Sequence, residues 1–351
     1  MKLRRKTLLI VGAVLIALNV VLYATSSILL LRSVHALEDS YVLQDIEHVE
    51  QAIDTEFDSL STIAQDYAEW DDTYEFAIDP GTNYVQSNFV DTTFAYQHLN
   101  LMALFDRDRN IVFQEGFDSI AEQPVPVPEA ILSIFTGDSA SAPLRIEGDS
   151  LRQEYRGIVN TERGLMMLVA RPILTSDAQG PVRGTLAVGR QLDRNRIETL
   201  ENATQLSLEL TSIDTIIESE DFARAFEALT ESSTDTFIQA LQPDENGELR
   251  TPQRADRIFR PLYFLTSNET LEHIAGYTLL RDLDNAPVAI VRVDSPREID
   301  RQGRVSVSYF TLTLAIVGAL FSVLTLLIVE RLVISPVTRL GDEVDRVGEL
   351  A

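Results

Sequence analysis

The stretch DYAEWDDTYEF, residues 66–76, contains the only tryptophan of the chain, and acidic residues and two tyrosines surround it. It follows an apolar series with spacings of three or four residues, which is typical of one face of a helix and close to a heptad repeat. That series comprises Val49, Ile53, Phe57, Leu60, Ala64 and Tyr67. We therefore predict one long helix that ends near Tyr74, before Pro80 and Gly81 break the helical pattern.

Two uncharged runs, residues 7–31 and 305–329, lie near the ends of the chain, and each is 25 residues long. A helix needs about 20 apolar residues to cross the hydrocarbon core of a bilayer, so both runs predict membrane spans. One alternative is that the first run is a cleaved signal peptide, but it exceeds the ~7–15 apolar residues usual for one. A second alternative is that both runs are buried helices of a soluble protein.

The basic residues among positions 1–6 predict a cytoplasmic N-terminus, although three arginines also flank the second run on its outer side. We expect an inner (plasma) membrane protein with both termini in the cytoplasm and residues 32–304 outside. The long helix would then leave the membrane as a stalk.

The composition excludes several classes of function. The formal net charge is −25, and residues 32–304 contain 22 basic and 49 acidic residues, which argues against nucleic acid as a partner. A hydrophobic fraction of 45% excludes a disordered chain. The chain has no cysteine, so thiol chemistry and zinc–thiolate sites are impossible.

Two sets of strand-like segments follow the predicted stalk helix. The first set is LNLMALFD, NIVFQEGFD, LRQEYRGIV, LMMLVARPIL and GPVRGTLAVGRQLD, with the proline-rich link EQPVPVPEA between its second and third members. A helix is expected over 194–203, and residues 216–243 have a helical and acidic pattern. The second set is QLSLELTSI, RIFRPLYFLT, EHIAGYTLLRDL and APVAIVRVD, with a tight turn at NAP, 285–287, and a return helix from Pro296. Antiparallel strands with helices grouped around them predict an α+β fold.

Three features together resemble a known family. They are the Trp-Asp-Asp-x-Tyr block at the end of a helix that leaves the membrane, HLNLMALFDRDRNIVF after it, and GTLAVGRQLD near residue 190. They resemble the CHASE family of extracytoplasmic sensor domains, specifically its fourth type, over about residues 55–200. The resemblance implies two Cache- or PAS-like antiparallel-sheet modules, which we expect at 32–200 (with the stalk helix) and at 201–296.

The C-terminal stretch RLVISPVTRLGDEVDRVGELA, within residues 330–351, is similar to the start of a HAMP linker, truncated before its second helix. Its apolar positions are spaced as in the seam of a parallel coiled coil, and they are Val337, Leu340, Val344, Val347 and Ala351. We therefore expect a homodimer that pairs through the HAMP helices and through the heptad of the stalk. The resemblance implies an output module beyond this chain, such as a cyclic-di-GMP cyclase or phosphodiesterase or a histidine kinase.

The candidate ligand-binding residues come from the blocks that carry the resemblance, and they are Tyr67, Trp70, Asp71, Asp72, Tyr74 and Asn100. Adjacent residues on a helix point about 100° apart, so we do not expect Asp71 and Asp72 to share a proton or a metal. The competing interpretation is that Trp70 is a structural plug and that the acids cap or pair with neighbouring groups, because large aromatic side chains dominate core burial. The sequence leaves both interpretations open.

No catalytic constellation stands out, so we expect the chain as given not to be an enzyme and to need no cofactor. The four histidines, at positions 35, 48, 98 and 273, do not have the spacing of metal ligands, and we predict no metal site. Asp106 and Asp108 match a calcium loop poorly and fit a hairpin turn better.

These patterns favour the sensory region of a transmembrane receptor, which passes a small-molecule or protein cue through the second span. Two alternatives are a membrane-tethered hydrolase, which would need a catalytic site, and a periplasmic partner-binding or structural protein without a small-molecule ligand.

Overall fold

The computed structural model describes residues 2–136, 154–231, 236–243, 249–250, 273–296 and 298–337. They form two compact units, which are treated separately below. One lies within Val42–Gln253 and Leu271–Pro296, and the other lies within Met1–Tyr41 and Arg297–Ala351. The predicted α+β class is confirmed, because the first of these units combines helices with two antiparallel sheets. The domain boundaries expected from the sequence stay a prediction.

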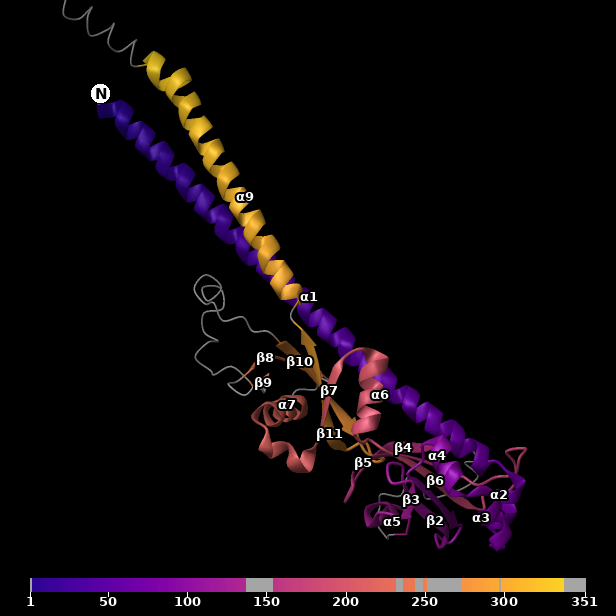
Figure 1. Ribbon diagram of the computed structural model, residues 1–351. Helices are drawn as coiled ribbons and strands as arrows, with labels where there is room; N and C mark the ends of the chain where they lie inside the picture. Colours follow the sequence, from indigo (N-terminus) through magenta and orange to yellow (C-terminus); the bar gives the residue numbers. More distant parts are fainter. Residues whose placement is uncertain are drawn as a thin grey trace, which may run out of the picture. The chain divides into compact units, whose positions relative to one another are not determined.

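The long helix α1 runs from Lys2 to Ala68 (Figure 1). It ends six residues earlier than predicted, because the backbone amide of Leu174 donates to the carbonyl of Ala68 at 2.9 Å and the chain turns at Trp70. Trp70 has an extended backbone, with φ −128° and ψ 131°, and it precedes a separate helix. The short helices that follow are α2 (Asp71–Phe76), α3 (Thr82–Asn88) and α4 (Asp91–Gln97).

The first sheet has six antiparallel strands in the order β3-β2-β1-β6-β5-β4. Their bounds are β1 (Leu101–Asp106), β2 (Ile111–Asp118), β3 (Gln123–Val125), β4 (Tyr155–Thr161), β5 (Gly164–Pro172) and β6 (Gly184–Gln191). The sequence predicted five of these strands. It missed β3 and the helix α5 (Glu129–Thr136), both of which involve the proline-rich link, because proline weakens a strand pattern except at a sheet edge, where β3 lies.

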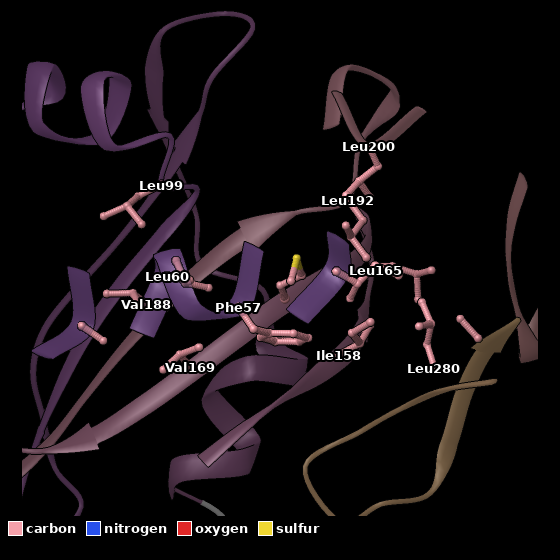
Figure 2. Close-up of a cluster of buried hydrophobic side chains, with 14 of the residues drawn as sticks. Phe57, Leu60, Leu99, Ile158, Leu165, Val169, Val188, Leu192, Leu200 and Leu280 are labelled. Atoms are coloured by element: carbon pink, nitrogen blue, oxygen red, sulfur yellow. The ribbon is translucent and has the colours of Figure 1, made fainter. Parts of the chain in front are cut away.

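Both faces of this sheet are buried, so its central strands are apolar throughout rather than alternating. One face packs on α1 through side chains such as Met102, Val169 and Val188, as Figure 2 shows for Phe57 and Leu60 of the helix. The other face packs on Ile131 and Phe135 of α5, and its residues include Ala103, Ala170 and Ala187. These three alanines are direct neighbours across β1, β6 and β5.

The second sheet has five strands in the order β7-β11-β10-β8-β9. Its elements are α6 (Arg194–Thr204), β7 (Ser207–Ser212), the 3-10 helix Ile213–Glu218, α7 (Glu220–Glu231), β8 (Thr236–Pro243), β9 (Leu249–Arg250), β10 (His273–Arg281) and β11 (Pro287–Pro296). The helix predicted over 216–243 is wrong in its second half, where Thr236, Phe237 and Ile238 begin a strand, as β-branched and aromatic residues favour. The strand predicted over 257–266 lies outside the described residues.

The stalk part of α1, residues 42–68, packs its heptad seam against both sheets. Val42 and Ile46 approach the second sheet so closely at Gly276 that a Cβ there would lie 2.5 Å from Ile46 Cδ1. Val49, Phe57 and Leu60 belong to the same buried cluster. The seam from which we predicted stalk pairing is therefore covered by the chain's own sheets, and pairing of the stalk would need another face.

The two sheets share a joint. The tip of the β10–β11 hairpin packs on β4, where a Cβ on Gly157 would lie 2.6 Å from the backbone nitrogen of Leu283. The Leu283 side chain packs against the cluster between the first sheet and α5. On the α1 side, Leu280 of the second sheet belongs to the same core cluster as Leu165 and Leu200 (Figure 2). The two sheets thus form one continuous hydrophobic core.

The other unit contains the apolar part of α1 and the helix α9 (Glu298–Val329), which continues as a π-helical turn over Glu330–Ile334. Both helices have the length and composition of a membrane span. Of the predicted HAMP positions, only Val337 lies among the described residues; Leu340, Val344, Val347 and Ala351 lie outside them.

Candidate functional site

The tryptophan block forms the end of the stalk together with a hairpin loop that connects β5 and β6. Trp70 lies between α1 and α2, and Asp71 and Asp72 form the first turn of α2. The loop reaches this turn from residues 173–183, and its Leu174 amide closes the last turn of α1. Five of the six candidate residues, all except Asn100, are therefore brought together at this end of the first sheet.

An aromatic cluster surrounds Trp70. Its ring centroid lies 6.5 Å from that of Tyr67 and 6.0 Å from that of Tyr84, and both pairs are tilted. Tyr84 also stacks on Phe76 at 4.6 Å. Phe89 then links the cluster to the first sheet by stacking on Phe113 of β2 at 4.7 Å.

The Trp70 side chain is half-buried, so it is neither fully buried in the core nor fully exposed to solvent. Aromatic pairs at such distances stabilise a fold beyond the area that they bury. One part of the Trp70 ring packs against aromatic neighbours and another part contacts solvent, so both the structural role and the ligand-binding role of Trp70 stay predictions.

Tyr84 is the most perturbed group of this cluster. Its hydroxyl and that of the buried Thr73 share a hydrogen bond. Burial raises the pKa of Tyr84 to about 12, the hydrogen bond to Thr73 opposes the shift, and the charges of Tyr67 and Asp72 add to it. Burial, followed by the charge of Asp66, also raises the pKa of Tyr67. Both phenols are therefore neutral hydrogen-bonding groups at physiological pH.

The two adjacent acids have different surroundings. The Asp71 carboxylate accepts from the backbone amide of Ser176 at 2.9 Å, and the Ser176 hydroxyl accepts from the backbone amide of Asp71 at 3.1 Å. This reciprocal pair ties the start of α2 to the loop. Asp72 is exposed beside the aromatic cluster. The two carboxylates thus do not form a catalytic pair.

Tyr74 holds the same loop from the other side. Its hydroxyl donates to the carbonyl of Pro181 at 3.2 Å and accepts from Arg183 Nε at 3.0 Å. The Arg183 guanidinium also lies 5.3 Å from the centre of the Tyr74 ring, within the range of a cation–π contact. Tyr74 is therefore a positioning residue for the loop.

Asn100 does not join this group. Its amide nitrogen donates to the carbonyl of Phe117 at 3.1 Å and to the Ser119 hydroxyl at 2.9 Å, and its amide oxygen accepts from the Gln191 backbone at 2.9 Å. It precedes β1, whereas the aromatic cluster meets the sheet where Phe113 pairs with Leu104. Four residues of strand, about 13 Å, separate these levels. A buried amide with three bonds locks the strand ends together.

Several residues that form this site were not predicted from the sequence. Tyr84 and Phe89 lie on or after α3, which no pattern predicted, and Arg183 and Ser176 come from the loop about a hundred residues later. The amino-acid composition of the loop 173–183 could have predicted a turn there, since it is rich in the small and polar residues usual in turns. Within the described residues, no group of three or more histidine or acidic side chains could hold a metal ion.

Comparisons with known proteins support the family predicted from the sequence. Residues 52–211 match the family model described as the CHASE4 domain, so the resemblance is confirmed for that part of the chain. The methanogenesis regulatory histidine kinase FilI of Methanothrix harundinacea (strain 6Ac) is 25% identical over 349 residues. The matched region is 99% of this chain and 35% of FilI, so the chain spans about a third of that relative.

Two solved structures are similar at low sequence identity. The extracellular domain of vpHK1S-Z8 is 12% identical with a TM-score of 0.46, and the match covers 76% of this chain and 96% of that domain. The periplasmic domain of LuxQ from Vibrio cholerae is 13% identical with a TM-score of 0.38, and the match covers 73% of this chain and 98% of that domain.

Proposed function

We propose that this chain, which carries a CHASE4 domain, is the sensory and membrane-spanning region of a signalling receptor. Residues 32–304 would lie outside the cell membrane with both termini in the cytoplasm, and a cue would act on the modules at 32–200 and 201–296. The signal would pass through α9 and the HAMP-like stretch to an output module. A histidine kinase is favoured over a cyclic-di-GMP enzyme, because FilI is a histidine kinase and matches nearly the whole chain.

One observation carries this proposal. The last strand of the second sheet, β11, ends at Pro296, and the apolar helix α9 begins at Glu298. A single residue separates them, so the connection has little slack. In this proposal a displacement of β11 is passed to the start of α9 through this short covalent connection. A tether for an independent binding domain would not need so short a connection.

The route from the first module to β11 is supported by the joint at Gly157. The hairpin tip at Leu283 contacts the apolar cluster between the first sheet and α5. The same hairpin continues through nine paired positions of β10 and β11 to Pro296. A change in packing behind the first sheet would then shift the hairpin as one piece. Shifts of ~1–2 Å at such elements are enough for switching in other proteins.

The stalk is the fixed element in this proposal. Its acids bind both sheets, since Asp45 accepts from Ser295 and Glu50 accepts from Thr278 on the second sheet. Glu56 holds Arg190 of the first sheet at 2.8 Å. Sliding of the stalk along the sheets would break all of these contacts at once. A shift of the hairpin leaves the pair of Glu56 and Arg190 in place and changes only the contacts of Asp45 and Glu50, because Ser295 and Thr278 lie on the hairpin itself.

The candidate cue site is the tryptophan block. Asp71 and Tyr74 are engaged by the loop 173–183, so they would position it. The exposed carboxylate of Asp72 and the solvent-facing part of Trp70 would then meet a cue, with Tyr67 beside them. Asn100 would act only through the strands that it locks.

A homodimer would pair through the face of the stalk that points away from the sheets. This face is exposed and uncharged over about five turns, and its residues are Gln44, His48, Gln51, Thr55, Ser59 and Thr62. The exposed acids of the stalk, such as Glu47 and Asp54, lie to its sides. In a parallel pair each residue meets its own copy, and like charges would repel. An uncharged stripe on an acidic chain suits that requirement.

The proposal can be tested without knowing the cue. Residues 1–351 would be fused to the catalytic core of a histidine kinase that lacks its own sensor. One to four alanines would then be inserted after Pro296, each rotating α9 by about 100° relative to β11. We expect basal autophosphorylation to vary with helical period. Matched insertions in the β1–β2 turn after Arg107 should have no effect. Equal activity in every variant would contradict the proposal.

A further inference from the structure

A polar contact joins the two apolar helices in the middle of their uncharged runs. Asn19 of α1 donates from Nδ2 to the Ser322 hydroxyl of α9 at 3.0 Å and to its own helix at the carbonyl of Leu15, at 2.8 Å. The Ser322 hydroxyl in turn donates to the carbonyl of Gly318 at 2.8 Å. Three hydrogen bonds thus run from one helix to the backbone of the other.

The side chain of Asn19 also fits a notch in α9. A Cβ on Gly318 would lie 1.8 Å from Asn19 Oδ1, so only glycine leaves room for the amide at this level. The Asn19 side chain is therefore held between a missing side chain at 318 and a hydroxyl one turn later at 322. The notch and the hydrogen bond specify the same relative position of the two helices.

Two further close approaches fix the register as antiparallel. A Cβ on Gly303 would lie 2.8 Å from Val34 Cγ1, and one on Gly12 would lie 4.0 Å from Leu326 Cδ1. The paired levels are thus 34 with 303, 19 with 318, and 12 with 326. Ser27 lies between the first two levels, and its buried hydroxyl has no hydrogen-bond partner among the described residues. Asn19 therefore supplies a polar contact between the helices at a level where a second hydroxyl nearby, that of Ser27, does not.

In the hydrocarbon core of a bilayer, loss of the hydrogen bond between Asn19 and Ser322 would cost more free energy than in water. Lipid tails are as apolar as leucine, so helix pairs there are held by close packing at small residues and by hydrogen bonds between helices. An amide nitrogen that lost its partner could not turn to water. A hydrogen bond is lost beyond about 3.5 Å, so a shift of ~2 Å along α9, across the bond of 3.0 Å between Asn19 and Ser322, would lengthen it to about 3.6 Å and break it.

We propose that Asn19, Ser322 and Gly318 form a polar latch that holds α9 in its resting register against α1, and that signalling through α9 must release it. The release step rests on the proposed function, whereas the latch itself is a property of the two helices in a bilayer. The latch supplies an energetic threshold, since displacement of α9 breaks the hydrogen bond to Ser322 in an apolar medium and leaves Asn19 Nδ2 with only its bond to Leu15 in the same helix.

The experiment uses the full chain in phospholipid nanodiscs and takes advantage of the absence of cysteine. Val34→Cys combined with Gly303→Cys reports the resting register, because a Cβ at 303 lies 3.5 Å from Val34 Cβ, within disulfide range. Val34→Cys combined with Val307→Cys reports a register shifted by one turn. Oxidative cross-linking rates are compared in the parent, Asn19→Leu and Ser322→Ala. Thr325→Val is the control, because its hydroxyl bonds only to its own helix at Phe321.

We expect Asn19→Leu to slow the 34–303 cross-link at least threefold and to accelerate the 34–307 cross-link. Ser322→Ala should act in the same direction more weakly, and Thr325→Val should match the parent. Parental rates for both latch variants would overturn the latch. In the kinase fusion, Asn19→Leu should also change basal output; shifted cross-linking with unchanged output would overturn the release step alone. Cross-linking does not depend on any output module, so failure of the proposed function is distinguishable.

Discussion

Glu56 of α1 and Arg190 of β6 form an ion pair of 2.8 Å although their side chains are only 18% and 5% exposed. Arg190 also donates to the carbonyls of Gln97 and His98, and Arg196 of α6 approaches Glu56 at 3.2 Å. Burial and the charge of Arg196 lower the pKa of Arg190, and Glu56 opposes that shift. One carboxylate therefore joins the stalk, the first sheet and the helix leading to the second sheet.

Glu56→Gln should destabilise the chain by roughly 3–5 kcal/mol, because it leaves a buried arginine without its counter-charge. Chemical denaturation of the full chain in nanodiscs measures the change. Asp58→Asn is the matched control on the same helix, since Asp58 is 76% exposed and pairs with Arg156 at the surface. That control should cost less than about 1 kcal/mol. Equal effects of the two substitutions would contradict the role of Glu56.

Trp70→Ala should lower stability by about 1–3 kcal/mol, less than the ~3–5 kcal/mol of a fully buried aromatic, because the ring is half-buried. Trp70→Phe should recover most of the loss by keeping the contacts to Tyr67 and Tyr84. Thermal unfolding followed by circular dichroism distinguishes the three proteins. A melting curve for Trp70→Ala identical to that of the parent would show that the ring serves only an external partner.

Gly157→Ala should destabilise the joint by about 1–3 kcal/mol, because the new methyl group meets the backbone of Leu283 and the hairpin tip must move. In the kinase fusion it should also change basal activity, which a local packing defect elsewhere would not do. Gly81→Ala is the control, since nothing lies within 4 Å of its Cβ position. If both variants behave like the parent, the hairpin tip does not couple the modules.

The raised pKa of Tyr84 predicts a stability loss at alkaline pH. The folded state holds the phenolic proton up to about pH 12, whereas an unfolded tyrosine releases it near pH 10. The contribution is fully present below pH 10 and is lost between about pH 10 and 12, as the unfolded state ionises first. Tyr84→Phe should therefore lose less stability than the parent over that window. Parallel pH profiles for the two proteins would disprove the shift.

His48→Cys should cross-link between two copies of the chain in membranes if the uncharged stripe is the pairing face. Val49→Cys is adjacent in sequence but fully buried against the sheets, so it should not react. The readout is a dimer band on non-reducing gels at low oxidant concentration. Cross-linking that never exceeds the Val49→Cys background across positions 44, 48, 51 and 55 would exclude this face.

The sequence predicted the elements whose patterns are local. The helical spacing from Val49 to Tyr67, five strands of the first sheet and the helix after Asp193 are confirmed, because alternation and periodicity follow from which side chains are buried. What the heptad could not reveal is its partner. A helix buried against the chain's own sheets and a helix buried against a second copy require the same apolar spacing.

The errors arose where distant segments decide the local structure. The end of α1 at Ala68 depends on a hydrogen bond from the backbone amide of Leu174. No residue near the tryptophan block predicts this contact, because Leu174 is about a hundred residues away in the sequence. The candidate residue Asn100 was grouped with Trp70 because both lie in blocks typical of the family, yet its three hydrogen bonds serve strand ends elsewhere. Proximity along the chain did not reveal which residues share a surface.

The shared core around Leu280 affects how chains with this fold can diversify. A cut near residue 200 separates the strands of the two sheets but splits one cluster that contains Leu165, Leu200 and Leu280. Recombination that exchanged only the first module would bring together core surfaces that had not been selected to fit. Exchange of the whole region 42–296 should therefore preserve the fold, whereas exchange of a single module should not.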